Sequence, residues 1–274
     1  MALFISSLNS GSNGNCYYIG NDTEAVLVDA GISCREVERR MDRSGLSMDK
    51  VKAILVSHEH SDHITGIPVL AKKYRLPVYI TPATLAGSSL KLIPELVHSF
   101  SAAEALQFGR LRITAFVKRH DAADPHSFFI TDGEVNVGVF TDIGAACDQV
   151  THYFKKCHAA FLESNYCPDM LINGSYPYHL KRRISGGHGH LSNAEALELF
   201  SRYRNKKLSH LILSHLSQQN NNPELVAGMF APAARATKVV VASRYRESEV
   251  FTIAAGGGLR KNSRSGQLSL FEER

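Results

Sequence analysis

Short apolar runs separated by polar, turn-rich segments characterise the first half of the chain. Residues 25–29 and 51–56 are rich in Val, Ile, Leu and Ala and lead into turns, which predicts buried strands. Residues 33–43 carry apolar side chains at helical spacing and predict an amphipathic helix. The same patterns predict a helix over 67–74 and strands over 3–7, 16–19, 78–80, 111–117, 127–131 and 135–140.

The second half repeats this alternation. It predicts strands over 161–163, 208–214 and 238–242 and helices over 193–204 and 223–235. Two groups of strands with helices between and outside them favour an α/β fold with a two-sheet core covered by helices, an αββα sandwich. At 274 residues with 44% hydrophobic content, the chain can bury that core as a single domain, which we assign to residues 1–253.

The composition changes from Ala254 onward. Ala-Ala-Gly-Gly-Gly is followed by a polar, basic stretch, and Gln-Leu-Ser-Leu-Phe stands near the end. We expect residues 254–274 to form a flexible tail that carries a short apolar terminus.

Charge and cysteine content narrow the class of protein. Lys and Arg number 31 against 26 Asp and Glu, and the net charge of +5 is compatible with a polyanionic partner without demonstrating one. The five cysteines are odd in number and contain no Cys-x-x-Cys pair, which argues against a disulfide framework or a zinc ribbon. The sequence shows neither a basic leader with a long apolar region nor an apolar stretch of membrane-spanning length. We therefore expect a reducing compartment, the cytoplasm, and no membrane partner.

Three histidines and an aspartate follow the predicted strand 51–56. In Ser-His-Glu-His-Ser-Asp-His, residues 57–63, the side chains of His58, His60, Asp62 and His63 are expected to converge around one tight loop. Imidazole nitrogens and a carboxylate oxygen suit zinc, manganese or iron, and so many ligands from one segment indicate two ions. A solvated, histidine-rich loop is the alternative.

Three more candidate ligands stand directly after apolar runs. His120 follows 111–119, Asp142 follows 137–141 and His215 follows 211–214. Each of them alone would more often be a capping residue or lie at the edge of the core. Because all three repeat the arrangement seen at His58, in which a ligand follows a strand, we predict that they bind metal.

This ordered set resembles the metallo-β-lactamase superfamily, and the likeness spans nearly the whole chain up to the tail. The resemblance implies two groups of three ligands and one bridging carboxylate: His58, His60 and His120 on one ion, Asp62, His63 and His215 on the other, and Asp142 on both. It also implies that Asp29 braces the first ligand loop.

Residues outside the ligand set must indicate the reaction, because the superfamily contains thioesterases, lactonases, β-lactamases, diiron enzymes and nucleases. Glu163 at a strand end, His190 at a helix start and Ser-His-Leu-Ser at 214–217 are similar in order to the phosphodiesterase branch typified by ribonuclease Z. Two ions about 3.5–4 Å apart would activate a water and neutralise the phosphate. His190, held by Glu163, would protonate the departing oxygen or clamp the phosphate, with a capping role as the alternative. We predict Asp62, Glu163 and His190 as catalytic residues.

Further segments are candidate substrate contacts. Residues 10–15, Ser-Gly-Ser-Asn-Gly-Asn, could bring backbone amides to a phosphate, although a glycine hairpin explains them equally well. The basic run 181–183 could form an electrostatic track for nucleic acid, or it could be an ordinary solvated helix end. The predicted substrate contacts are Ser12, Asn15, Asn165, Lys181, Arg182 and Arg183.

A closer resemblance is to the bacterial YycJ/WalJ/VicX family. It rests on residues 10–15, His-Asp-Ala-Ala-Asp-Pro at 120–125, Glu-Ser-Asn at 163–165 and the segments 180–184, 189–193 and 213–217. The family implies a manganese- or zinc-dependent 5′→3′ exonuclease that acts on DNA in mismatch repair and replication-linked processes. One departure is Tyr166-Cys167, which stands where His-Asp is expected and would affect end preference if it touches substrate.

The tail carries a candidate partner motif. Gln267, Leu268, Leu270 and Phe271 look like the peptide by which bacterial DNA enzymes dock on the replication sliding clamp. The two apolar anchors would enter a pocket, and tethering would raise the concentration of enzyme at DNA. A terminal segment that packs on its own core is the alternative.

Other functions remain open. A small-molecule hydrolase of the same fold, such as a thioesterase or cyclic phosphodiesterase, would need neither the tail motif nor the basic track. A ribonuclease Z-like RNA processing enzyme is disfavoured because no long insertion for gripping tRNA is present. A regulatory protein that has lost its metals would not be expected to retain the complete ligand set.

Overall fold

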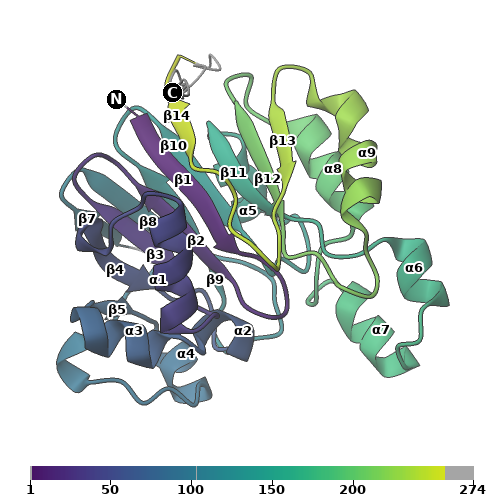
Figure 1. Cartoon of the computed structure of the whole chain (residues 1–274). Helices are drawn as coiled ribbons and strands as arrows, with labels where there is room; N and C mark the ends of the chain where they lie inside the picture. The colour runs from purple at the N-terminus through teal and green to yellow at the C-terminus, as the bar shows by residue number, and fades with distance from the viewer. Residues whose placement is uncertain (1, 103, 257–274) are drawn as a thin grey trace, which may run out of the picture.

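The computed structural model describes residues 2–102 and 104–256, which form two seven-stranded sheets with helices on both outer faces (Figure 1). The strands are β1 (Ala2–Asn9), β2 (Cys16–Gly20), β3 (Ala25–Val28), β4 (Val51–Leu55), β5 (Val78–Tyr79), β6 (Val97–His98), β7 (Ala105–Phe108), β8 (Leu111–Val117), β9 (His126–Thr131), β10 (Asn136–Phe140), β11 (Ala159–Glu163), β12 (His210–Ser214), β13 (Lys238–Val241) and β14 (Phe251–Ala254). The helices are α1 (Cys34–Arg43), α2 (Ser61–Ile64), α3 (Ile67–Tyr74), α4 (Pro82–Gly87), α5 (Asp148–Phe154), α6 (Pro168–Asn173), α7 (Tyr178–Ser185), α8 (Asn193–Tyr203) and α9 (Pro223–Ala234), with 3₁₀ turns at Met48–Lys50 and Pro94–Leu96. The predicted αββα sandwich is confirmed.

Each sheet combines an antiparallel part with a parallel part. In the first sheet, ordered β14-β1-β2-β3-β4-β5-β6, the strands from β14 to β3 are antiparallel and those from β3 to β6 are parallel. In the second, ordered β13-β12-β11-β10-β9-β8-β7, the strands from β7 to β10 are antiparallel and those from β10 to β13 are parallel. The two sheets therefore repeat one topology.

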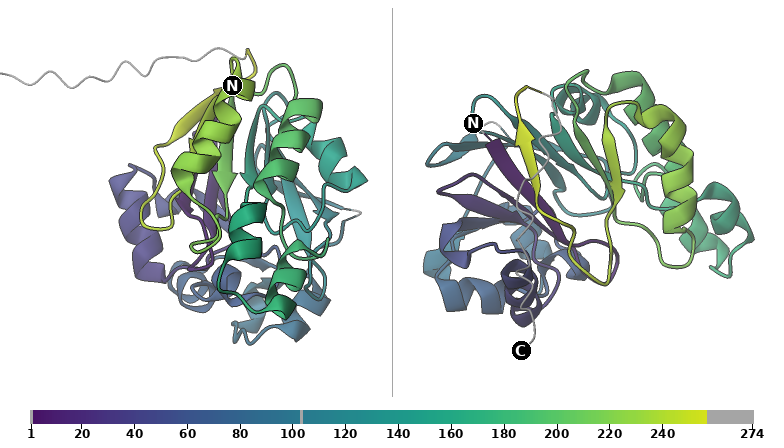
Figure 2. Two further views of the ribbon diagram at one scale, coloured as in Figure 1. Left: turned by 90° about the vertical axis from the view of Figure 1, so that its right-hand side faces the viewer. Right: turned by 45° about the horizontal axis from the view of Figure 1, so that its top comes forward.

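The central strands are buried on both faces, which explains their continuous apolar runs. Phe161 of β11 and Ile212 of β12 belong to the core between the sheets. Their neighbours Leu162 and Leu213 belong to a second core that includes apolar side chains of α5, α8 and α9. On the opposite side, a third core packs α1 and α3 against β3 and β4. Figure 2 shows α8 and α9 on one side of the paired sheets and the helices of the first half on the other.

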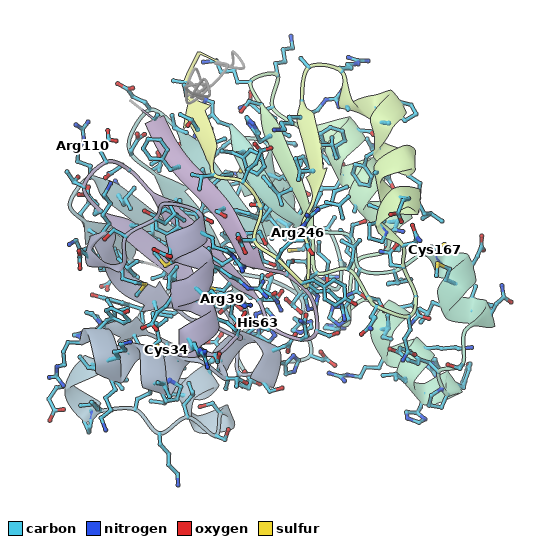
Figure 3. The ribbon with its side chains drawn as sticks, viewed as in Figure 1. Cys34, Arg39, His63, Arg110, Cys167 and Arg246 are labelled. Carbon is cyan, nitrogen blue, oxygen red and sulfur yellow. The ribbon has the colours of Figure 1, made fainter. Side chains whose placement is uncertain are left out.

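Carboxyl ends of strands from both sheets meet at one edge of the sandwich, where His63 is labelled in Figure 3. Parallel strands end at the same edge of a sheet, so the residues that follow them are brought together. The backbone turns sharply there, because Asp29, Asp142 and His215 have φ values of 60°, 53° and 57°. These left-handed conformations are strained for residues other than glycine, and such strain often occurs at functional sites.

Two details differ from the sequence-based expectation. The histidine-rich segment is not a plain tight loop, because Ser61–Ile64 forms the one-turn helix α2 with His60 as its N-cap residue. The predicted domain boundary at 253 falls inside β14, which pairs with β1. The sandwich therefore includes Ala254.

Two further points concern the tail peptide and the lengths of the helices. The clamp-like peptide at 267–271 lies outside the described residues. Within them, every helix is too short or too polar to cross a membrane.

Candidate metal centre

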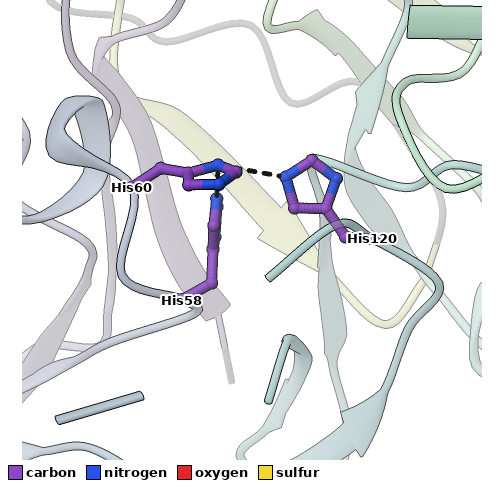
Figure 4. Close-up of side chains that lie close together, drawn as sticks. All are labelled: His58, His60 and His120. Carbon is purple, nitrogen blue, oxygen red and sulfur yellow. Dashed lines mark hydrogen bonds between the residues drawn. The ribbon is translucent and has the colours of Figure 1, made fainter. Parts of the chain in front are cut away.

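Three imidazole rings meet where β4 and β8 end, and we call His58, His60 and His120 the histidine trio (Figure 4). His60 Nδ1 lies 3.1 Å from His58 Nε2 and 3.3 Å from His120 Nε2. The three rings stand edge-on to one another, and one nitrogen of each ring faces the other two rings. This arrangement brings three imidazole nitrogen donors close to one point, as zinc sites do.

Hydrogen bonds to the outer nitrogens hold the rings in place. His58 Nδ1 lies 2.8 Å from Ser57 Oγ, and His120 Nδ1 lies 2.8 Å from the carbonyl oxygen of Gly189. Burial lowers the pKa of His58 well below its ordinary value and lowers the pKa of His120 to about 4. Both imidazoles are therefore neutral near pH 7, which is the form that binds metal.

A second group of donors forms the aspartate trio, which consists of Asp62, His63 and His215. Asp62 Oδ2 lies 3.2 Å from His215 Nε2 and 3.6 Å from His63 Nε2. Asp62 and His63 come from α2, whereas His215 follows β12 of the other sheet. The aspartate trio therefore spans both halves of the fold.

Asp29 braces the first ligand segment, as the family resemblance implied. Its Oδ2 lies 2.7 Å from His63 Nδ1, and its two oxygens accept hydrogen bonds of 2.8 Å from the amide and the hydroxyl of Ser57. Burial lowers the pKa of His63, but the carboxylates of Asp142 and Asp29 outweigh burial and raise it to about 10. A carboxylate paired with the outer nitrogen of a ligating histidine is the usual support of a metal site.

Asp142 lies between the two trios. Its Oδ2 lies 3.1 Å from His63 Nε2, and its Oδ1 lies 3.9 Å from His120 Nε2. The residue is only 1% exposed, and Oδ2 has no partner among the described residues beyond its contact with His63 Nε2, which lacks hydrogen-bond geometry. A buried carboxylate oxygen with so few donors is costly, and a cation would remove that cost. The donors present therefore fit divalent metal ions.

Glu163 connects the trios to His190. Its Oε1 lies 2.8 Å from His190 Nδ1 and 3.1 Å from His215 Nδ1, and its Oε2 accepts from the amides of Ile143 and Leu191 at 2.7 and 3.2 Å. Burial raises the pKa of Glu163, but His190 outweighs burial and the net pKa is lowered. Glu163 is therefore a fully bonded carboxylate that fixes the His190 ring.

Asn15 was expected to contact substrate, but it has no exposed surface. Its amide nitrogen lies 3.2 Å from Asp62 Oδ2, and its carbonyl oxygen accepts from the hydroxyl of Tyr17 at 3.1 Å. Tyr17 also contacts Ser10, whose hydroxyl accepts from the amide of His215 at 2.7 Å. The hairpin between β1 and β2 thus holds the metal-ligand candidates Asp62 and His215 in place from the buried side of the site. The side chain of Asn15 is out of reach of substrate.

A hollow of about 170 Å³ adjoins His190 and His215. Three of the predicted substrate contacts, Ser12, Asn165 and Arg183, line it. Arg183 pairs with Asp121, and Asn165 donates to the carbonyl of His215 at 2.7 Å. The hollow is therefore lined by polar groups that are already held in position.

The other basic residues of α7 lie further out. Lys181 donates to the carbonyl oxygen of Ile172 at 2.6 Å, which ties α7 to α6. Arg182 is exposed and lies over the ring of Tyr178. Tyr166, one of the two residues that depart from the family pattern, is buried in a small core under these helices. Its ring therefore serves packing.

Lys118 was not anticipated from the sequence. It is 3% exposed, and its Nζ donates to the carbonyl oxygen of Thr141 at 2.7 Å. The bond fixes the residue that precedes Asp142, and the charge helps to lower the pKa of His58 and of His120. Lys118 stands in an apolar run two residues before a ligand, so only the folded chain reveals where its ammonium group lies.

Comparison with known proteins agrees with this geometry. Residues 24–216 match the profile of the Beta-lactamase superfamily domain. The chain belongs to the metallo-β-lactamase superfamily. It is 37% identical over 228 residues to the exodeoxyribonuclease YycJ of Bacillus anthracis, which covers 82% of this chain and 86% of that protein. It is 32% identical over 225 residues to the exodeoxyribonuclease WalJ of Streptococcus pneumoniae, covering 80% and 84%.

The superfamily fold is also seen in solved structures. The metallo-β-lactamase fold protein YhfI from Bacillus subtilis superposes with a TM-score of 0.71 at 18% identity, over 92% of this chain and 99% of that one. The predicted membership of the YycJ/WalJ branch of the metallo-β-lactamase superfamily is thus confirmed, as is the prediction of a metal-dependent hydrolase.

Proposed function

We propose that this chain is a dinuclear, metal-dependent 5′→3′ exodeoxyribonuclease that acts on DNA ends in repair or replication. Two relatives are named exodeoxyribonucleases, and each aligns with this chain over more than four fifths of its own length. The observation that carries the proposal is the placement of His190, paired with Glu163, beside both trios and a polar hollow. A phosphodiesterase needs such a group to protonate the departing oxygen.

The trios define where two ions would be held. We assign one to the histidine trio and the other to the aspartate trio, with Asp142 shared between them. Nitrogen and carboxylate donors suit zinc or manganese, and iron is also compatible. Bound ions of this kind activate a water molecule and neutralise the charge on the phosphate.

The remaining polar residues would bind the substrate and move a proton. Because Glu163 accepts at His190 Nδ1, it fixes the orientation of the ring and leaves Nε2 as the nitrogen that would donate a proton to the departing oxygen. Asp62 and Asp142 fix the charge of the site, and their carboxylates keep His63 and His215 oriented. Arg183, Ser12 and Asn165 would contact the sugar-phosphate chain in the hollow.

Digestion of end-labelled DNA tests this proposal. Duplex and single-stranded DNA labelled at the 5′ or the 3′ end would be incubated with manganese or zinc and with wild type or Asp62→Ala. We expect nucleotide release from the 5′ end by wild type and none by the variant. Release from the 3′ end would contradict the polarity. Activity on a thioester or on RNA with none on DNA would favour the small-molecule or RNA-processing alternatives.

We also propose that Gln267, Leu268, Leu270 and Phe271 dock on the replication sliding clamp. The order Gln-Leu-Ser-Leu-Phe supports this, since two adjacent apolar anchors suit an apolar pocket. Deletion after Gly266 should abolish clamp binding and leave digestion of naked DNA unchanged. The matched variant Phe271→Ala should weaken clamp binding strongly, whereas Ser269→Ala should not. A truncated chain that still bound the clamp normally would refute this role.

A further inference from the structure

A second cavity, of about 650 Å³, lies beside the metal centre. Its walls are the segment after β12, which includes Leu216 and Ser217, and the connection from β13 to β14, residues 243–249. That connection runs past the tip of the hairpin between β1 and β2 (Figure 1), and the amide of Ser10 donates to the carbonyl of Ser243 at 3.2 Å. Leu216 and Ser217 also line the hollow at His190, so one wall separates the two spaces.

Arg244 bridges the two spaces. Its guanidinium donates to Gln218 Oε1 at 2.8 Å and to the carbonyl oxygen of Leu216 at 3.0 Å, and it lies 3.4 Å from Ser12 Oγ. Gln218 lines the second cavity and Ser12 lines the hollow at His190. The guanidinium therefore contacts a residue from the lining of each space.

The charge of the second cavity is positive once its ion pairs are considered. Glu247 pairs with Arg43 at 2.6 Å, and Glu249 pairs with Lys238 at 2.5 Å. Both carboxylates on the rim are thus neutralised by cations from outside the cavity. Arg246, which is labelled in Figure 3, is exposed and forms no ion pair with any described residue. The charge available to a ligand is therefore that of a guanidinium, which favours phosphate.

The cavity also offers an aromatic face. Tyr245 stands next to Arg246 and is 73% exposed, which is unusual for so large a side chain without a partner. Phe251 and Val240 line the interior. An exposed aromatic ring beside an unpaired arginine is the combination with which proteins hold single-stranded nucleic acid, since bases stack on the ring while the cation meets the backbone.

We propose that this cavity holds the nucleotide next to the one at the metal centre, as an unpaired nucleotide of a DNA strand that runs from His190 across Arg244. The base stacks on Tyr245, and its phosphate meets Arg246. A base stacked inside a cavity cannot stay paired, so the strand is single at this position. This inference rests on the proposed nuclease function and identifies a substrate contact that the ligand residues do not supply.

Paired substitutions at Tyr245 test the stacking. The full-length protein would be assayed with manganese on a dinucleotide and on a single-stranded octanucleotide. Wild type should show a lower KM for the longer substrate. Tyr245→Ala should raise the KM for the octanucleotide about tenfold with little change in kcat, because a lost stacking contact weakens binding without touching the reaction. Tyr245→Phe keeps the ring and should retain the wild-type KM.

Paired substitutions of arginine test the phosphate contact. Binding of the octanucleotide would be measured by fluorescence anisotropy at several salt concentrations in an Asp62→Ala background, which prevents digestion. Arg246→Gln should reduce the slope of log affinity against log salt by roughly 0.7, as expected for one lost contact to a single strand. Arg110→Gln is the matched control, because Arg110 lies in the turn between β7 and β8, far from Arg246 in Figure 3.

The outcomes separate this inference from the proposed function. If wild type digests the octanucleotide, and Tyr245→Ala and Arg246→Gln both behave as wild type, the strand does not use this cavity and the inference is wrong. If wild type cleaves neither DNA nor bis(p-nitrophenyl) phosphate with manganese or zinc, the proposed function itself fails. A rise in the KM for the octanucleotide in Tyr245→Phe equal to that in Tyr245→Ala would also overturn the stacking role.

Discussion

The histidine trio and the aspartate trio are built from similar ligands but stand in opposite electrostatic surroundings. Around the histidine trio, burial and the ammonium group of Lys118 keep His58 and His120 neutral. Around the aspartate trio, the carboxylates of Asp142 and Asp29 overcome burial and favour the protonated form of His63. One site therefore offers neutral nitrogens, and the other holds excess negative charge.

This difference indicates how each site depends on its neighbours. The rings of the histidine trio are anchored by a hydroxyl and a backbone carbonyl, at Ser57 and Gly189. The rings of the aspartate trio are anchored by carboxylates, with His63 on Asp29 and His215 on Glu163. Apart from substitutions at Asp142, which the two trios share, substitutions at carboxylates should therefore affect the aspartate trio first.

Removal of a ligand from the aspartate trio should have the largest effect. We expect Asp62→Ala or His63→Ala to lower turnover by on the order of 10⁴-fold. When several residues act as one catalytic unit, removing one of them costs about as much activity as removing all of them. Metal analysis of the purified proteins should show that about one ion is lost and that the ion at the histidine trio is kept. His188→Ala serves as the control, since this exposed histidine contributes to neither trio. Loss of neither metal nor activity would contradict the assignment.

His190 should matter for the reaction and not for metal content. His190→Ala should lower kcat by roughly 10²-fold, the usual contribution of a positioned proton donor. Its metal content should equal that of wild type, which distinguishes it from His215→Ala, although both rings contact Glu163. A substrate with a good leaving group, such as p-nitrophenolate, should restore much of the rate. Equal loss on both kinds of substrate would argue against proton donation.

The strand ends explain how much of the centre was predictable. Every predicted ligand after His60 either lies in α2 or comes within three residues of the end of a strand, and the apolar runs identify those strands in the sequence. Two parallel sheet segments then bring the ends of β4 and β12 to one edge. Pattern reasoning could therefore find which residues meet, although it could not give the left-handed backbone at Asp142 or at His215.

The supporting contacts could not be predicted in the same way. Tyr17 and Lys118 lie within or next to strands and read as ordinary strand positions. The hydroxyl of Tyr17 meets Asn15 and Ser10 only once the first hairpin has formed, and Lys118 reaches the carbonyl oxygen of Thr141, 23 residues further along the chain. The helices α6 and α7 were missed because each is short and their apolar side chains form a core of their own. Strand β14 was missed because its partner β1 lies at the other end of the sequence.

Substitution of Asp29, which supports His63, should weaken metal binding at the aspartate trio selectively. Asp29→Asn keeps the size of the side chain and tolerates the left-handed backbone at this position, where φ is 60°. It removes the charge behind His63, so metal affinity at the aspartate trio should fall by about 10- to 100-fold, as for other outer partners of ligating histidines. Titration with metal should show a larger loss of affinity at the aspartate trio, whose His63 contacts Asp29 directly, than at the histidine trio, whose His58 meets Asp29 only through the hydroxyl of Ser57. Equal weakening of both would mean that the two trios do not act separately.

Chelation should show the smallest effect, on stability. A ligand that binds only the folded state, at a concentration of about 100 times its Kd, raises the free energy of unfolding by roughly 3 kcal/mol. For a domain of this size, that change raises the Tm by about 6–12 °C. Chelator should therefore lower the Tm of wild type by about that range. In Asp62→Ala the shift should be clearly smaller, because only the histidine trio still has an ion to lose. Calorimetry with and without chelator measures both shifts. If they were equal, Asp62 would not hold a metal and the asymmetry between the trios would have to be abandoned.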